Sequence, residues 1–125
     1  MIAGIGTDII EVQRVLEKID KNQGFREATF SPAEIAWCEN KPRRGEHYAA
    51  RFAAKEALLK AAGEGWTSAV SLPEISVLND PTGKPYFAFS GATARYFEGK
   101  NWTKIHLSLA HIREMAVAMV VVEIC

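Results

Sequence analysis

Glu56 and Lys60 supply a carboxylate and an ammonium group within an alanine-rich stretch at residues 51–61. Together with Phe52 they stand at positions i, i+4 and i+8, so the three share one face of a helix. The alanines around them leave room for a neighbouring backbone or a ligand. A carboxylate of this kind can hold a cation, while the ammonium group can face an anion. The alternative interpretation is an ordinary surface ion pair, worth about 0.3–0.5 kcal/mol.

A second carboxylate, Asp8, follows two glycines on one face of a predicted strand. Residues 2–12 alternate as a strand does, which puts Gly4, Gly6 and Asp8 on the same side. Two glycines on one strand face indicate the close approach of another backbone or of a ligand. Asp8 could instead cap the helix predicted by the apolar stripe that follows, formed by Val12, Val15, Leu16 and Ile19.

His106 is the third candidate, on a strand predicted at residues 104–110. Alternation turns His106 and Ser108 to one side of this strand and Ile105, Leu107 and Leu109 to the other. The neighbours of His106 on its own face are small. A structural histidine is the alternative interpretation.

The first helix, expected to run to about residue 22, carries three basic residues on an exposed flank: Arg14, Lys18 and Lys21. Such a flank can bind an acidic partner, although most basic flanks are simply solvated. If this flank does not bind a partner, Arg26, Arg43 and Arg44 are the next candidates.

The remaining segments define the elements that must position these residues. Strong helix formers at residues 46–62, followed by Gly63 and Gly65, predict the helix that carries Glu56 and Lys60. The sequence Ser31-Pro32-Ala33-Glu34 has the pattern of a capping box, so a short helix should begin there and end before Pro42.

The second half of the chain reads mainly as strands. Residues 75–78 and 86–89 predict a hairpin around the turn-forming residues 79–85, and Ser90 is a candidate cap for a helix at 92–98. Strands at 104–110 and 114–124 should be joined by a tight turn near Ile112. We therefore expect a single α+β domain spanning residues 1–125, with helices packed on an antiparallel sheet of the later strands and the first strand at its margin.

Composition limits the classes of partner. The chain has 15 basic and 15 acidic residues, so no net charge attracts it to nucleic acid or to a membrane surface. No apolar run approaches the length of about 20 residues that a membrane span needs. Cys38 and Cys125 are far apart and lack metal-ligand spacing, which argues against structural zinc and a disulfide scaffold and favours a cytoplasmic location.

Four motifs occur in register along the chain: Gly4-Ile5-Gly6-Thr7-Asp8-Ile9-Ile10-Glu11-Val12, Arg51-Phe52-Ala53-Ala54-Lys55-Glu56-Ala57, Gly83-Lys84-Pro85 and His106-Leu107-Ser108-Leu109-Ala110-His111. With these motifs the chain resembles the bacterial holo-[acyl-carrier-protein] synthases, the short type of 4′-phosphopantetheinyl transferase. The resemblance extends from residue 2 to residue 123. It implies transfer of the 4′-phosphopantetheine arm of coenzyme A to a serine of acyl carrier protein in support of fatty acid biosynthesis, with release of adenosine 3′,5′-bisphosphate.

The resemblance also implies roles for the candidate residues. Asp8 and Glu56 are expected to bind Mg²⁺, and Lys60 to neutralise charge on the phosphoryl group. The coenzyme A pyrophosphate is expected to complete the metal shell beside Asp8, with Lys60 and His106 near the phosphates. Gly83-Lys84-Pro85 is expected at the adenine and ribose end. Longer members of the superfamily hold two such halves in one chain, so this half-domain is expected to form a homotrimer with sites between subunits.

Several points stay open at this stage. Glu56, His106 or a bridging water could accept the proton of the carrier serine. Glu64 and Trp66 depart from the smaller, threonine-containing loop expected after the central helix. A non-catalytic binding module is one rival interpretation. The other is a different nucleotide-using enzyme, although the sequence has neither a P-loop nor GxGxxG.

Overall fold

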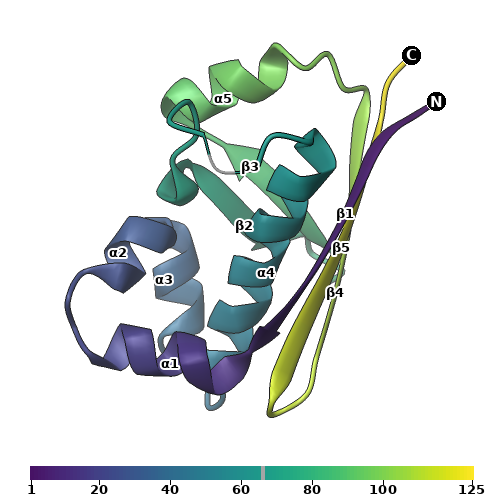
Figure 1. Ribbon diagram of the computed structural model, residues 1–125. Coiled ribbons are helices and arrows are strands. Elements are labelled where there is room, and N and C mark those ends of the chain that lie inside the picture. Colours follow the sequence, from purple (N-terminus) through teal and green to yellow (C-terminus); the bar gives the residue numbers. More distant parts are fainter. Residues whose placement is uncertain (66) are drawn as a thin grey trace.

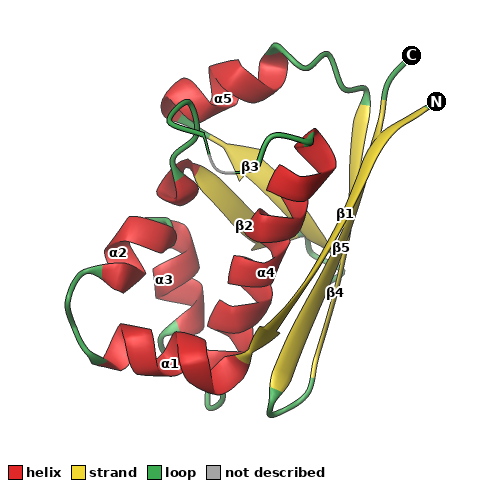
Figure 2. Cartoon of the chain, in the orientation of Figure 1, coloured by secondary structure: helices red, strands yellow, loops and turns green. Residues whose placement is uncertain are grey.

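Helix α4 (Arg44–Ala62) runs through the middle of the protein, between a three-stranded sheet and a separate hairpin (Figures 1 and 2). The computed structural model describes all residues of the chain except residue 66. The elements around α4 are, in order, β1 (Ile2–Glu11), α1 (Val12–Asp20), α2 (Phe25–Thr29), α3 (Pro32–Cys38), the 3₁₀ turn η1 (Leu72–Glu74), β2 (Ile75–Asn79), β3 (Pro85–Phe89), α5 (Gly91–Glu98), β4 (Lys104–His111) and β5 (Met115–Glu123). This arrangement confirms the predicted α+β class. No helix in the described part of the chain is long and apolar enough to cross a membrane.

The larger sheet has the antiparallel order β1-β5-β4, so β1 lies at its margin as the sequence predicted. The prediction that all the later strands share one sheet was wrong, because β2 and β3 pair only with each other. Two short strands joined by a turn satisfy each other's hydrogen bonds locally. The buried side of this hairpin, with Ile75 and Val77, instead packs into the core around α4.

Strand β1 lies directly against α4 because two of its residues have no side chain. A Cβ atom built on Gly6 would lie 1.9 Å from the carbonyl oxygen of Ala57, and one on Gly4 would lie 2.1 Å from that of Ala61. Only glycine permits this backbone approach. The approach sets the spacing between Asp8, which follows on the same strand face, and the α4 residues that face it.

The opposite side of α4 holds a buried ion pair. Lys55 and Glu34 both have fully buried side chains, with 2.6 Å between Nζ and Oε1. Lys55 also donates to the carbonyl oxygens of Thr29 and Leu72, and Glu34 accepts from the backbone N–H of Val77. The pair therefore joins α3 and α4 to the start of the hairpin.

Several predicted boundaries need correction. Asp8 lies inside β1 and caps no helix, since α1 begins four residues later with Glu11 in the N-cap position. Helix α1 ends at Asp20, and α4 begins two residues earlier than predicted. The short helix α2 was not predicted. The capping box at Ser31 is confirmed, as is the left-handed Gly63 that ends α4. Ser90 precedes α5 but forms no side-chain cap hydrogen bond.

Candidate active site

Lys60 on α4 reaches across to β1. Its Nζ donates to Oδ1 of Asp8 over 3.0 Å and to the carbonyl oxygen of Thr7 over 3.1 Å. The Lys60 side chain is 54% exposed and that of Asp8 only 14% exposed. An ammonium group is thus held at the protein surface beside a nearly buried carboxylate.

The second oxygen of Asp8, Oδ2, is buried and has no hydrogen-bond partner among the described residues. Glu56, one helical turn before Lys60, is half-buried nearby. Burial raises the pKa of Glu56, and repulsion from the Asp8 carboxylate raises it further, while Lys60 and Lys18 partly offset both effects. Two carboxylates, those of Asp8 and Glu56, therefore lie close together, and one oxygen of Asp8 lacks a hydrogen-bond partner among the described residues.

This donor set fits a hard divalent cation. Mg²⁺ typically binds one or two protein carboxylates and keeps several waters or substrate oxygens. Among the described residues, no group of three or more His, Cys, Asp and Glu side chains could hold a metal. The Asp8–Glu56 pair, which leaves room for waters and substrate oxygens, suits Mg²⁺.

A groove between α1, β1 and α4 is lined by neighbours of these carboxylates: Ile9 follows Asp8, and Phe52 lies one helical turn before Glu56. Its lining includes apolar residues, among them Ile10, Val15 and Phe52, and two of the predicted basic residues, Arg14 and Lys18. Because the Lys18 charge acts on Glu56, the basic flank begins close to the carboxylates. Lys21 lines a neighbouring hollow with Phe25, and the Nζ of Lys18 lies 5.5 Å from the centre of the Phe25 ring.

His106 does not join this group within one chain. Leu107 on β4 is buried toward α4, as the alternation predicted, so His106 points to the sheet face that is turned away from α4. We call this the outer face. There His106 Nε2 lies 2.5 Å from Oε2 of Glu123, and this hydrogen bond lowers the Glu123 pKa. Asp8 points to the inner face, because it shares a side of β1 with Gly6.

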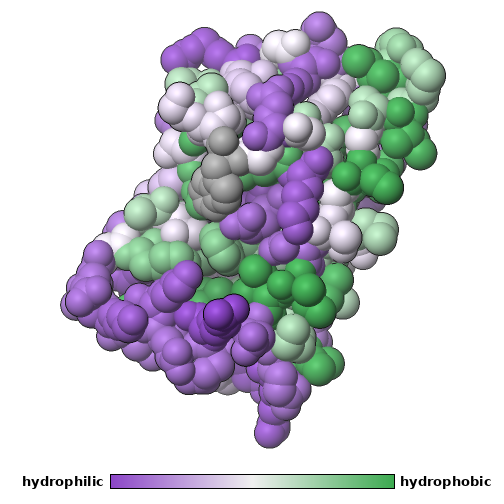
Figure 3. Space-filling view, in the orientation of Figure 1, coloured by the Kyte–Doolittle hydropathy of each residue, from purple (hydrophilic) through white to green (hydrophobic). Residues whose placement is uncertain are grey.

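The outer face is unusually apolar for an exposed surface. Its large exposed apolar side chains are Ile5, Ile9, Val117 and Met119, which range from 36% to 68% exposed. The exposed polar residues Thr7, His106 and Ser108 lie on the same face. Hydrophobic residues are visible along the side of the molecule that carries β1 (Figure 3). Monomeric proteins seldom leave such a contiguous patch uncovered.

Gly83-Lys84-Pro85 lies at the end of the β2–β3 hairpin. The carboxylate of Asp80 accepts from the backbone N–H of Lys84, and Gly83 adopts a left-handed conformation with φ of 91°. Asn79 donates to the Gly83 carbonyl oxygen and accepts from Arg51 on α4. The hairpin end is therefore braced against α4 through Arg51.

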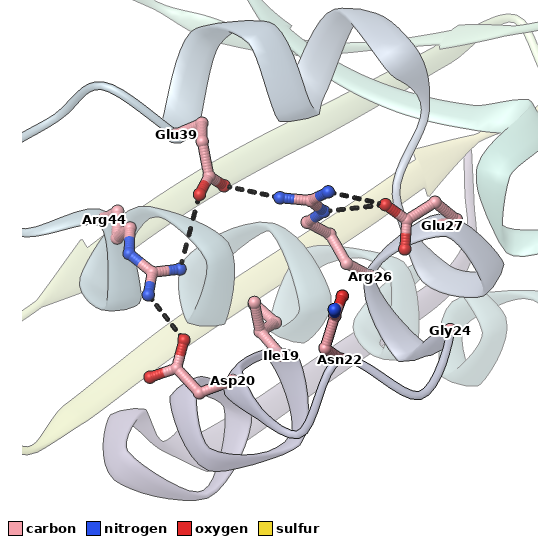
Figure 4. A pocket seen from close by; sticks show the side chains of 8 residues that line it. All are labelled: Ile19, Asp20, Asn22, Gly24, Arg26, Glu27, Glu39 and Arg44. Atoms are coloured by element: carbon pink, nitrogen blue, oxygen red, sulfur yellow. Dashed lines mark hydrogen bonds and ion pairs between the residues drawn. The ribbon is translucent and has the colours of Figure 1, made fainter.

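Other charged residues proved to be engaged internally. Arg26 pairs with Glu27 and Glu39, whereas Arg44 pairs with Asp20 and Glu39 (Figure 4). Arg43 lies 3.8 Å from Glu46. Arg14 also lies 3.9 Å from a carboxylate, that of Glu11, but its side chain is 76% exposed, against 30% for Arg26 and 29% for Arg44. Arg26 and Arg44 are therefore poorer candidates for binding a partner than Arg14.

The loop after α4 contains the two residues that depart from the expected pattern. Glu64 accepts a hydrogen bond from Tyr96 and pairs with Lys100, so it fixes this loop to α5. Trp66 lies outside the described residues. Sequence reasoning also missed the Thr7 carbonyl as a Lys60 partner, for which a sequence carries no signal.

Comparison with known proteins points to one family. Residues 4–120 match the model of the 4′-phosphopantetheinyl transferase superfamily. The holo-[acyl-carrier-protein] synthase of Cytophaga hutchinsonii is 46% identical over 96% of both chains, and that of Koribacter versatilis is 40% identical over 98% of this chain and 99% of the relative.

Solved structures agree with these matches. The holo-[acyl-carrier-protein] synthase of Neisseria meningitidis superposes with a TM-score of 0.90 at 35% identity, covering 98% of this chain and 99% of that one. The synthase of Bacillus anthracis, in complex with coenzyme A (3′,5′-ADP), gives a TM-score of 0.82 at 39% identity, covering 100% and 99% of the two chains.

Proposed function

Because this chain belongs to the 4′-phosphopantetheinyl transferase superfamily, we propose that it transfers the 4′-phosphopantetheine group of coenzyme A to a serine of an acyl carrier protein. In this reaction the serine oxygen attacks the phosphorus that bears the pantetheine arm. The bond from that phosphorus to the bridging oxygen breaks, and adenosine 3′,5′-bisphosphate leaves with the electron pair. A role in fatty acid biosynthesis follows from the carrier substrate.

The observation that best supports this activity is the buried Oδ2 of Asp8, which lies beside Glu56 and Lys60 and has no hydrogen-bond partner among the described residues. An uncompensated carboxylate oxygen in a folded protein is costly unless a ligand satisfies it. We propose that Asp8 and Glu56 bind Mg²⁺. When bound, this ion supplies positive charge to the pyrophosphate oxygens.

In this proposal Lys60 neutralises charge on the same phosphates. Its Nζ already lies 3.0 Å from Asp8 at the protein surface, so little rearrangement is needed to meet a phosphoryl oxygen. Most catalysis of phosphoryl transfer comes from such positioning and charge stabilisation. Glu56, whose pKa is raised, is the group on this chain best suited to accept the serine proton at the site, directly or through a water.

The two substrates occupy different surfaces in this proposal. The carrier binds along α1, where Arg14, Lys18 and Lys21 present positive charge beside the groove. Coenzyme A extends from the carboxylates toward a Gly83-Lys84-Pro85 turn. The complex of the Bacillus anthracis relative with coenzyme A (3′,5′-ADP) supports coenzyme A as the donor. The free Cys38 and Cys125 suit the reducing cytoplasm that we propose as the location.

A homotrimer would explain the position of His106. Asp8 and His106 lie on opposite faces of the same sheet, so they can meet only if the outer face of one subunit packs against the site of another. The exposed apolar side chains of the outer face supply an interface for this packing. In the trimer, His106 faces the phosphates held by the neighbouring subunit.

The activity is tested by incubating the protein with apo acyl carrier protein, coenzyme A and Mg²⁺ and measuring the carrier mass. We expect a mass increase of one phosphopantetheine group, together with release of adenosine 3′,5′-bisphosphate. No mass increase with several bacterial carriers would refute the proposed activity.

The proposal that each site is shared between two subunits is tested by mixing two inactive variants. Subunits carrying Asp8→Ala, exchanged with subunits carrying His106→Ala, should regain activity because some interfaces then contain both native residues. Variants that show no gain after subunit exchange would argue against sites between subunits.

A further inference from the structure

Three charged residues lie at helix ends whose partial charge has the same sign as their own. Asp20 is the last residue of α1 and Glu39 is the C-cap of α3, although the C-terminal end of a helix carries partial negative charge. Arg44 is the first residue of α4, where the partial charge is positive. The helix dipole disfavours each of these charges at its position, so contacts with other elements should compensate it.

The three charges compensate one another in space. Arg44 Nη2 lies 2.5 Å from Asp20 Oδ1, and its Nη1 lies 3.7 Å from Glu39 Oε1. The other oxygen of Glu39 accepts from the buried hydroxyl of Tyr48 over 2.5 Å and lies 3.2 Å from Nη1 of Arg26. Figure 4 shows Asp20, Arg26, Glu39 and Arg44 around one hollow. We call Asp20, Arg26, Glu39 and Arg44 the helix clamp.

The clamp joins elements that the chain itself connects loosely. It ties the C-terminal end of α1 and the start of α2 to α3 and α4, across the exposed residues 21–24. In that connection, Asn22 and Gly24 both have positive φ. Ile19 is the last buried apolar anchor of α1. The other contacts of α1 with α4 lie further from this end of the helix, among them Leu16 and Val12 beside Gly45.

Lys18 and Lys21 flank Asp20 in the sequence, so the clamp controls where their charges lie. Arg44 is the first residue of α4, which carries Glu56 and Lys60 further along. The clamp therefore sets the distance from the basic residues of α1 to the carboxylate site through rigid helices. Carrier binding along α1 would depend on that distance, whereas coenzyme A binding at the hairpin would not.

We propose that Glu39 and Arg44 are positioning residues for the carrier: they fix the C-terminal end of α1 on the catalytic helix α4. This inference rests on the proposed function, in which α1 receives the carrier. Neither residue contacts the reacting atoms. Their effect should therefore appear in recognition of the carrier and leave the chemical step unchanged.

The test is Glu39→Gln, which keeps the size of the side chain and its ability to accept from Tyr48 while removing its charge. We expect the KM for the carrier to rise about fivefold or more, because misplaced charges weaken encounter and docking. The value of kcat and the KM for coenzyme A should stay within about twofold of wild type. Asp20→Asn, at a more exposed position, should show the same pattern with little effect on folding.

Glu27→Gln is the matched control. It also removes a carboxylate that pairs with Arg26, at 2.7 Å, but Glu27 is the next residue on the same helix and bridges no two elements. Its kinetic constants should match wild type. An unchanged carrier KM in Glu39→Gln, or an equal loss in Glu27→Gln, would overturn the proposal.

Two further results separate this proposal from the proposed function. A wild-type protein that loads no carrier refutes both. If Arg14→Glu with Lys18→Glu raises the carrier KM and Glu39→Gln does not, docking on α1 stands and the clamp proposal fails. A loss of kcat in step with thermal stability in Glu39→Gln would also contradict it, because that result indicates general destabilisation.

Discussion

Substitution of Lys60 by alanine should separate catalysis from stability. The Lys60 ammonium group and the Asp8 carboxylate lie 3.0 Å apart, a distance at which two charges interact by about 5.5 kcal/mol at an effective dielectric constant of 20. Lys60 is more than half exposed, so solvent screening reduces the net contribution of the pair to about 0–1 kcal/mol. Thermal unfolding of Lys60→Ala should therefore differ little from that of wild type.

Turnover should respond far more strongly. Removal of one preorganised group that stabilises charge in the transition state typically lowers kcat by about 10²- to 10³-fold. Initial rates of carrier loading at varied coenzyme A concentration give kcat and KM separately. We expect the loss to appear mainly in kcat, because the ammonium group meets charge that develops during transfer.

The control is Arg95→Ala, which removes a positive charge from the exposed side of α5. It should leave both constants unchanged. If Lys60→Ala instead raises the KM for coenzyme A and leaves kcat unchanged, the residue contributes to ground-state binding and the reasoning is wrong.

Three further predictions concern the carboxylates, the docking helix and the buried ion pair. The folded-state pKa of Glu56 is raised above its ordinary value of 4.5, so the stability that Glu56 contributes should be lost as pH rises from about 4.5 through its folded-state pKa. In melting curves, the stability of wild type relative to Glu56→Gln should therefore fall over this pH range; a difference that stays equal at every pH would contradict this. Arg14→Glu with Lys18→Glu should raise the KM for the carrier and weaken the salt dependence of the rate. An unchanged KM for the carrier would show that this basic flank is only a solvated surface. Lys55→Met should lower the free energy of unfolding by about 3–5 kcal/mol, because it leaves the buried Glu34 charge unpaired. Combination with Glu34→Leu should recover only part of that loss in denaturant titrations, because it also removes the acceptor of the Ser31 and Val77 backbone N–H groups. Equal losses in the single and double variants would argue against a buried ion pair.

Local sequence signals predicted most of the elements. The glycine at position 63 ends α4, the capping box at Ser31 starts α3, and the turn residues at 79–85 form the hairpin. Each of these signals acts within a few residues of its effect. The two glycines before Asp8 also correctly indicated a close backbone neighbour, which is α4.

Long-range relations were beyond the sequence. The Lys55–Glu34 pair spans 21 positions, and both residues look like ordinary surface charges when they are read locally. Alternation correctly placed His106 opposite Leu107, but it could not show that Asp8 and His106 lie on different faces of the same sheet. That relation depends on strand order, which each strand's own pattern leaves undetermined. For the same reason, the sequence did not show that β2 and β3 form a sheet separate from β1, β5 and β4.

The central claim, that Asp8 and Glu56 form one Mg²⁺ site for transfer to the carrier, is tested most directly by carrier loading over a Mg²⁺ titration in wild type, Asp8→Ala and Glu56→Ala. Each variant removes a charged ligand and little core volume, so both should stay folded. We predict Mg²⁺-dependent loading by wild type and a loss of at least about 100-fold in each variant, since metal stabilisation of developing charge is worth several kcal/mol. Near-normal loading by either folded variant at ordinary Mg²⁺ concentration would contradict the claim.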